Sequence, residues 1–392
     1  MQNNRYKTLI WLIPIALLLL WLKFWLLIIL WVLIGIWWIK KNVSTTIRQW
    51  WTKRQPASKR LYEWLWAAAF ATALVFAIKA SWLDLFRLPS SSMETTIGNG
   101  DMVLINKLIM GPRIHANSVD WYYRAPGYSR LQRNDLIVFN FPEGDTLLNQ
   151  QRTESYYSFK RNYNPKASRK GFRTSYKNVT HRPSYIKRVM GLPGDSLQIA
   201  DGILKVNGAT QHFNEATIRK YIAINSDGDS ILNALNVVPY NHYQYKKTTL
   251  YEFSIDVINQ HSILREYFEP FVLEKNSQDP NIFPHEYAFR YNYDHIGPLL
   301  IPQKGMSIEL TPHNIAIYAR LIDVYEENEL EVRDGQIYIN GKKCNSYTPK
   351  MNYYWVMGDN QPHSYDSRYW GFLPENHIIG VSRWHYHISK KT

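Results

Sequence analysis

Three short segments of the 392-residue chain contain the side chains that acyl transfer requires. The first, residues 87–97 (RLPSSSMETTI), clusters serines directly after a long apolar stretch. A serine hydroxyl becomes a nucleophile when a neighbouring base takes its proton. Serine clusters are more often turns or helix caps. A cluster just beyond a membrane boundary, however, would face the cleavage point of a substrate anchored in the same bilayer.

The second segment, residues 185–195 (YIKRVMGLPGD), offers a base. Lys187 alternates with the apolar residues Ile186 and Val189 in a strand-like pattern, and Arg188 should point to the opposite face. A lysine on a half-buried surface loses solvation, which lowers its pKa, and the neutral amine can then accept the proton of a serine. The alternative is a lysine on the solvent-facing side of a strand, without a catalytic role.

The third segment, residues 356–374 (VMGDNQPHSYDSRYWGFLP), mixes turn formers, charged residues and aromatic residues. Asp359, Asp366 and Arg368 are suited to an ion-pair and hydrogen-bond scaffold around a site. The alternative is a loop with a purely structural role.

Together the three segments resemble bacterial signal peptidase I, a family of membrane-bound leader peptidases. The family motif Pro-Ser-x-Ser-Met matches residues 89–93. The lysine motif Tyr-Ile-Lys-Arg-x-x-Gly-x-Pro-Gly-Asp matches residues 185–195, and the final box, Met-Gly-Asp-Asn with Ser-x-Asp-Ser-Arg-Tyr-Trp-Gly, matches residues 357–371. The chain departs from the family at Thr95, usually proline, and at residues 361–363 (Gln-Pro-His).

The resemblance implies a role for each matching residue. Ser92 would be the nucleophile, Lys187 the general base, and the hydroxyl of Ser90 would join the Ser92 amide in an oxyanion hole. Four residues would support the lysine: Ser364, which would orient it, and Asp359, Asp366 and Arg368. The implied reaction is removal of signal peptides from secreted preproteins after small residues, and it needs no cofactor and no metal.

The apolar segments that precede these motifs predict a multi-pass membrane anchor. Residues 8–39 are long enough for one tilted span, or for two half-length segments folded back at Lys23. A second helix is predicted at residues 61–83. The connecting loop, residues 40–60, carries seven basic residues and no acidic one, which indicates a cytoplasmic loop. The prediction is therefore a bacterial cytoplasmic membrane protein with residues 84–392 on the extracytoplasmic side.

From residue 84 onward the pattern predicts a mainly β catalytic domain, and the resemblance implies small twisted sheets. Apolar strand signals alternate with turn residues, including the Asn-Gly pairs typical of hairpins. The segments 201–208 (DGILKVNG) and 334–341 (DGQIYING) share one pattern, which two unrelated hairpins with the same turn chemistry would explain. Residues 143–182 are predicted to be a long loop, and residues 210–330 an insertion. The strands expected with most support are 102–106, 136–141, 185–190, 337–340 and 353–357.

The amino-acid composition limits the classes of molecule that the protein is expected to bind. A formal net charge of +14 suits nucleic acid or an anionic membrane surface, and the apolar first quarter of the chain favours the membrane. The single cysteine, Cys344, excludes an internal disulfide, and the twelve histidines form no HExxH motif. The expected partners are signal peptides of secreted preproteins and membrane lipid, without nucleic acid.

Two other functions remain to be separated from the peptidase. One is a related Ser-Lys protease that cleaves itself or a regulator, which two membrane segments disfavour. The other is a non-catalytic membrane scaffold that binds exported chains, which has no need of Ser92 or Lys187.

Overall fold

A computed structural model describes residues 56–87, 91–98, 100–148, 155–162 and 174–386. Three features predicted from the sequence lie outside these residues: the apolar segment 8–39, most of the basic loop 40–60, and Ser90.

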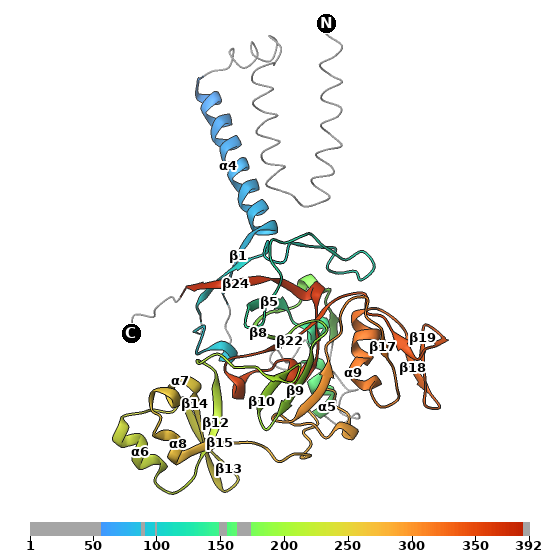
Figure 1. The fold of residues 1–392 in the computed structure, drawn as a ribbon. Helices are drawn as coiled ribbons and strands as arrows, with labels where there is room; N and C mark the ends of the chain where they lie inside the picture. The colour runs from blue at the N-terminus through green and yellow to red at the C-terminus, as the bar shows by residue number, and fades with distance from the viewer. Residues whose placement is uncertain (1–55, 88–90, 99, 149–154, 163–173, 387–392) are drawn as a thin grey trace.

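A long helix, α4 (Pro56–Ser81), occupies most of the predicted segment 61–83. Figure 1 shows α4 standing away from the β-rich domain, with strand β1 following at its base. Within the described residues, no helix combines the length and the apolarity that crossing a membrane demands.

A seven-stranded sheet forms the centre of the domain, in the order β1-β2-β24-β5-β8-β22-β23, and every neighbouring pair is antiparallel. The strand latest in the chain, β24, therefore lies between β2 and β5. The predicted strands 102–106 and 353–357 appear with those bounds. The predicted strand 136–141 ends one residue earlier, and the predicted strand 185–190 is extended by one residue at each end. The strands are β1 Leu83–Arg87, β2 Met102–Asn106, β5 Leu136–Asn140, β8 Ser184–Gly191, β22 Tyr353–Met357, β23 Leu373–Pro374 and β24 Ile378–Tyr386.

The two similar segments each form a strand between two tight turns. β10 (Ile203–Val206) follows β9 (Ser196–Ala200) and precedes β11 (Ala209–Thr210). The second copy is made by β18 Leu330–Arg333, β19 Gln336–Ile339 and β20 Lys342–Lys343. In each Asp-Gly and Asn-Gly turn both residues have positive φ, as type I′ turns require. The two copies lie in separate sheets, which agrees with unrelated hairpins that share turn chemistry.

The predicted insertion 210–330 is not one unit. Residues 218–270 form their own four-stranded sheet, β13-β14-β12-β15, around a separate apolar core that includes Phe253 and Leu264. Strand β16 (Ile296–Leu300) then returns to pair with β9. The elements of the separate unit are β12 Ile218–Ala223, α6 Gly228–Leu235, β13 Asn241–Tyr245, β14 Thr248–Ser254, α7 Ile255–Gln260, α8 Leu264–Tyr267 and β15 Phe268–Pro270.

The described residues of the predicted loop 143–182 include regular structure, namely the helix α5 (Tyr156–Asn162) and a two-stranded pair. Phe159 of α5 is buried, so one apolar side chain anchors a segment that reads as polar. The remaining strand pairs are β3 Arg113–Ile114 with β4 Tyr123–Arg124, β6 Thr146–Leu148 with β7 Thr174–Tyr176, and β17 Ile308–Glu309 with β21 Ser346–Tyr347. The remaining helices and helical turns are Ser91–Met93, Pro142–Asp145, Val179–His181, Tyr287–Phe289, α9 Ile315–Arg320, a π-helical turn Leu321–Tyr325, Gln361–His363, α10 Ser367–Trp370 and Glu375–His377.

Candidate active site

Ser92 lies in a single 3₁₀ turn, Ser91–Met93, that the core holds in place. The next side chain, Met93, is 1% exposed and packs with Val103, Ile105 and Ile186. Burying a methionine contributes roughly 1.5–3 kcal/mol. The methionine of the motif therefore fixes the turn, and Ser92 itself is largely buried.

Lys187 lies in the middle of β8, and its Nζ donates a hydrogen bond to Oγ of Ser92. The lysine is 2% exposed. Burial lowers the pKa of Lys187 to about 8, and the negative charge of Asp366 opposes only part of that shift. The structure thus joins a serine hydroxyl to an amine that loses its proton near neutral pH.

The final box holds the Ser91–Met93 turn from the other side. The backbone N–H of Asn360 donates to the carbonyl oxygen of Ser92 at 3.0 Å, and its side-chain amide donates to the carbonyl oxygen of Ser91 at 3.0 Å. The hydroxyl of Thr96 donates to the Asp359 carboxylate. Two segments more than 260 residues apart therefore fix one turn.

The charged residues of the box form two separate buried pairs. Arg368 donates to Asp366 through Nε at 2.8 Å and Nη2 at 2.7 Å. Asp359 accepts instead from Arg188, at 2.8 and 2.6 Å. Strand alternation suggested an Arg188 that faces away from the site, and it missed this pair because β8 is buried on both faces.

Ser364 donates its hydroxyl to Oδ2 of Asp366 at 2.7 Å. Burial alone would raise the pKa of Asp366, but Arg368 and Ser364 outweigh it and bring the pKa below its ordinary value. The carboxylate that attracts the Lys187 amine is therefore itself fixed by two side chains of the same box. The resemblance implied a Ser364 that orients Lys187, whereas the hydrogen bond that the structure gives Ser364 goes to Asp366.

Gly358 belongs to the final box and packs between Ser364 and the Ser91–Met93 turn, where there is no room for a side chain. A Cβ on Gly358 would lie 2.3 Å from Oγ of Ser364 and 2.6 Å from the carbonyl oxygen of Ser92. We expect Gly358→Ala to displace Ser92 and lower kcat/KM about 100-fold, because small misplacements of reacting groups cost that much. Peptide cleavage kinetics, with circular dichroism to establish folding, measures the effect.

Gly341→Ala is a matched control for that substitution. A Cβ on Gly341 meets open space, and φ is +74°, so the added methyl strains a remote hairpin alone. This variant should lose some thermal stability and keep wild-type kcat/KM. Equal activity losses in the two variants would contradict the role given to Gly358.

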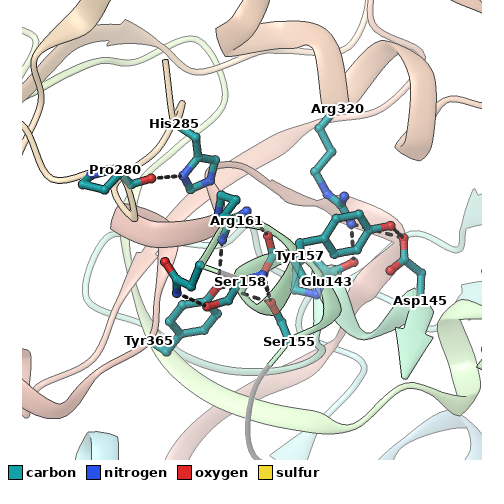
Figure 2. A network of polar contacts seen from close by, with 12 residues as sticks. Glu143, Asp145, Ser155, Tyr157, Ser158, Arg161, Pro280, His285, Arg320 and Tyr365 are labelled. Carbon is teal, nitrogen blue, oxygen red and sulfur yellow. Dashed lines mark hydrogen bonds and ion pairs between the residues drawn. The ribbon is translucent and has the colours of Figure 1, made fainter. Parts of the chain in front are cut away.

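Ser92 and Lys187 open onto a cavity of about 310 Å³. Its far wall comes from segments that sequence reasoning treated as a loop. Figure 2 shows the polar contacts of that wall. Glu143 accepts hydrogen bonds from Ser155 at 2.6 Å and from Tyr365 at 2.7 Å. Arg161 of α5 lies 3.4 Å from the other oxygen of Glu143.

Arg320 at the end of α9 ties this wall to the rest of the domain. Its guanidinium lies 3.2 Å from Asp145 and 4.1 Å from the centre of the Tyr157 ring. Polar residues without a motif, scattered between positions 143 and 320, give no sequence signal for such a wall. A sequence feature that pointed toward this wall was the concentration of charged and aromatic residues in the final box, which contributes Tyr365.

Comparison with known proteins identifies the family of this chain. The family described as "Signal peptidase, peptidase S26" matches residues 61–279 and 349–387, more than half of the chain. Signal peptidase I of Buchnera aphidicola subsp. Baizongia pistaciae is 25% identical over 321 residues, which cover 81% of this chain and 74% of the relative. Signal peptidase I of Haemophilus influenzae is 25% identical over 312 residues, covering 79% and 64%.

Among solved structures, a crystal structure of a signal peptidase I from Enterococcus faecalis aligns with 64% of this chain and 97% of its own, at 16% identity and a TM-score of 0.21. The family match contains all three motif segments. The chain therefore belongs to the signal peptidase family, peptidase S26, and its function is that of a signal peptidase I.

Proposed function

We propose that this signal peptidase cleaves preproteins by acyl transfer, with Ser92 as nucleophile and Lys187 as general base. The observation that carries the proposal is the hydrogen bond between Nζ of Lys187 and Oγ of Ser92, made by a lysine whose burial lowers its pKa to about 8. An amine in that state can accept a proton at the pH at which exported proteins are processed.

The steps follow from this pair. Neutral Lys187 takes the hydroxyl proton as Ser92 Oγ attacks the scissile carbonyl carbon. The backbone N–H of Ser92 and the hydroxyl of Ser90 stabilise the oxyanion, an effect of about 3–4 kcal/mol per donor. The ammonium of Lys187 then protonates the departing amine, which leaves as the mature protein. Water, deprotonated by Lys187, releases the signal peptide from Ser92.

The specificity for small residues ahead of the cleavage point belongs to the same proposal and rests on the family alone. The test is incubation of the detergent-solubilised protein with a purified preprotein, followed by N-terminal sequencing of the product. A shortened chain beginning after an Ala-x-Ala-like sequence supports the proposal. A stable complex with uncut preprotein supports the scaffold alternative and excludes the peptidase chemistry.

We also propose that residues 8–39 and 61–83 anchor the protein in the bacterial cytoplasmic membrane, with the loop 40–60 inside and residues 84–392 outside. The seven basic residues of the loop support this orientation. At the base of α4 the exposed side chains of Trp82, Leu85 and Leu104 provide an apolar surface on the side from which the helix leaves.

This topology predicts the result of protease digestion. Protease added to intact spheroplasts should degrade the β-rich domain and leave the 40–60 loop intact. An epitope tag in the loop and another after residue 330 report the two sides by immunoblot. Protection of the second tag would contradict the orientation.

A further inference from the structure

His363 shares the catalytic cavity with Ser92 and Lys187 and has so far been given no role. It ends the 3₁₀ turn Gln361–His363, directly before Ser364. Its side chain is 41% exposed, an unusual exposure in a box whose other polar side chains, Asp359, Ser364 and Asp366 among them, are buried. The imidazole is therefore accessible to a molecule in the cavity.

A buried carboxylate from the separate four-stranded unit orients this ring. Nε2 of His363 lies 2.9 Å from Oε2 of Glu252, whose side chain is 0% exposed. Glu252 is on β14, in register with Lys220 of β12. A buried carboxylate requires a hydrogen-bond donor, so the proton on Nε2 points at Glu252. Nδ1 is then the ring nitrogen left for the cavity, and in the described part of the chain it has no protein partner.

The four-stranded unit also contacts the final box and the residues around the Ser91–Met93 turn. The backbone N–H of Ile218 donates to the carbonyl oxygen of Asp359 at 2.8 Å. Tyr240 donates to Glu94 beyond the nucleophile turn, accepts from Asn360 at 3.3 Å, and its ring lies 6.3 Å from that of His363. These contacts place the unit directly behind His363, which itself lines the cavity.

We propose that His363 is a substrate-binding residue that accepts a hydrogen bond from a main-chain N–H of a bound preprotein through Nδ1, and that Glu252 is its positioning residue. The ligand chemistry is that of an extended peptide, whose main-chain N–H groups can donate to the unprotonated Nδ1 of a fixed imidazole. The inference rests on the proposed cleavage at Ser92, because the peptide must cross that residue to meet His363. The consequence is that the unit formed by residues 218–270 contributes to substrate binding through His363.

The experiment measures kcat and KM of the full-length, detergent-solubilised protein on one signal-peptide substrate and on versions shortened residue by residue from each end. His363→Ala should raise KM about 5- to 10-fold on the long substrate, as expected for one lost hydrogen bond, with kcat within about twofold of wild type. The difference in KM should disappear once shortening removes the peptide group that His363 contacts.

Variants of Glu252 distinguish a residue that positions His363 from one that only stabilises the fold. Glu252→Gln keeps an acceptor for Nε2 and should change KM by no more than about twofold. Glu252→Ala frees the ring and should match His363→Ala, and the double variant should be no worse than either alone, because both remove the same contact. If Glu252→Ala does not fold, His363→Gln, which retains a donor for Glu252, tests the same contact.

Tyr251→Phe is the matched control, because it loses one hydrogen bond, to Asp229, within the same unit, and Tyr251 does not line the cavity. Its KM should equal that of wild type. The proposal is overturned if His363→Ala leaves KM unchanged, or lowers kcat and thermal stability together at every substrate length. Absence of cleavage by the wild-type protein would instead refute the proposed function, so the two failures are distinguishable.

Discussion

Ser92→Ala is expected to lower kcat/KM for preprotein cleavage by about 10⁴-fold or more, the scale of loss when the nucleophile of a serine protease is removed. Oγ of Ser92 accepts the hydrogen bond of the Lys187 amine, and the turn that carries it is fixed by Met93 and Asn360. Removing one oxygen therefore leaves the site assembled but without an attacking atom. The measurement is single-turnover cleavage followed by gel electrophoresis.

Ser91→Ala is the matched control, since Ser91 is the adjacent serine and is exposed. The contacts of Ser91 with Asn360 and Glu94 use its backbone carbonyl, which the substitution leaves in place. This variant should keep most of the wild-type activity. A dead Ser91→Ala beside an active Ser92→Ala would show that the nucleophile is assigned one residue out of register.

Lys187 variants should separate activity from stability. Wild-type kcat/KM should rise with pH, with its midpoint near the pKa of about 8, because the amine works as a base only after it loses its proton. Lys187→Arg should be inactive across the range, because guanidinium stays protonated. Substantial cleavage by the arginine variant would exclude Lys187 as the base.

The same burial lowers the free energy of unfolding while Lys187 is charged, because it removes water from the ammonium group. The pKa is about 8 in the folded protein and 10.5 for an unperturbed lysine, so the unfolded state binds more protons between those values and stability rises with pH across them. Below pH 8 the full cost applies, about 3 kcal/mol at 1.36 kcal/mol per pKa unit. Lys187→Met should therefore raise the free energy of unfolding at pH 7 by about that amount, as measured by urea denaturation, and the gain should vanish near pH 10.5. An unchanged free energy of unfolding at pH 7 would contradict the burial of a charged lysine at this position.

The contact between Ser92 and Lys187 was predictable because each residue lies in a contiguous motif of the family. Asp-Gly and Asn-Gly turns likewise predicted their hairpins, since a two-residue turn is a local property of the backbone. The wall around Glu143 was not predictable, because it joins polar residues from α5, α9 and the final box. The Arg188–Asp359 pair was missed because alternation separates two faces of a strand without saying that both are covered.

The unit formed by residues 218–270 shows the same limit at larger scale. Its strands are individually short and mixed in pattern, and their pairing depends on a core of residues such as Tyr221 and Phe268, far apart in the sequence. Nothing local indicates that Glu252, a strand glutamate, is wholly buried or that it meets His363. Contacts over more than a hundred residues are properties of the assembled fold.

The position of β24 bears on the order in which the central sheet can assemble as the chain is made. β24 is the only strand joining the β1–β2 pair to β5 and β8 among the strands described, so a growing chain holds the central sheet in two parts until residue 378 and beyond have emerged. Ser92 follows β1 on one part, and Lys187 belongs to β8 on the other. Closing so long a loop is slow, because its entropy must be lost before the contacts form. Before β24 pairs, no strand pairing among the described strands joins the part that precedes Ser92 to the part that carries Lys187, and the packing of Met93 on Ile186 is a contact that links the two.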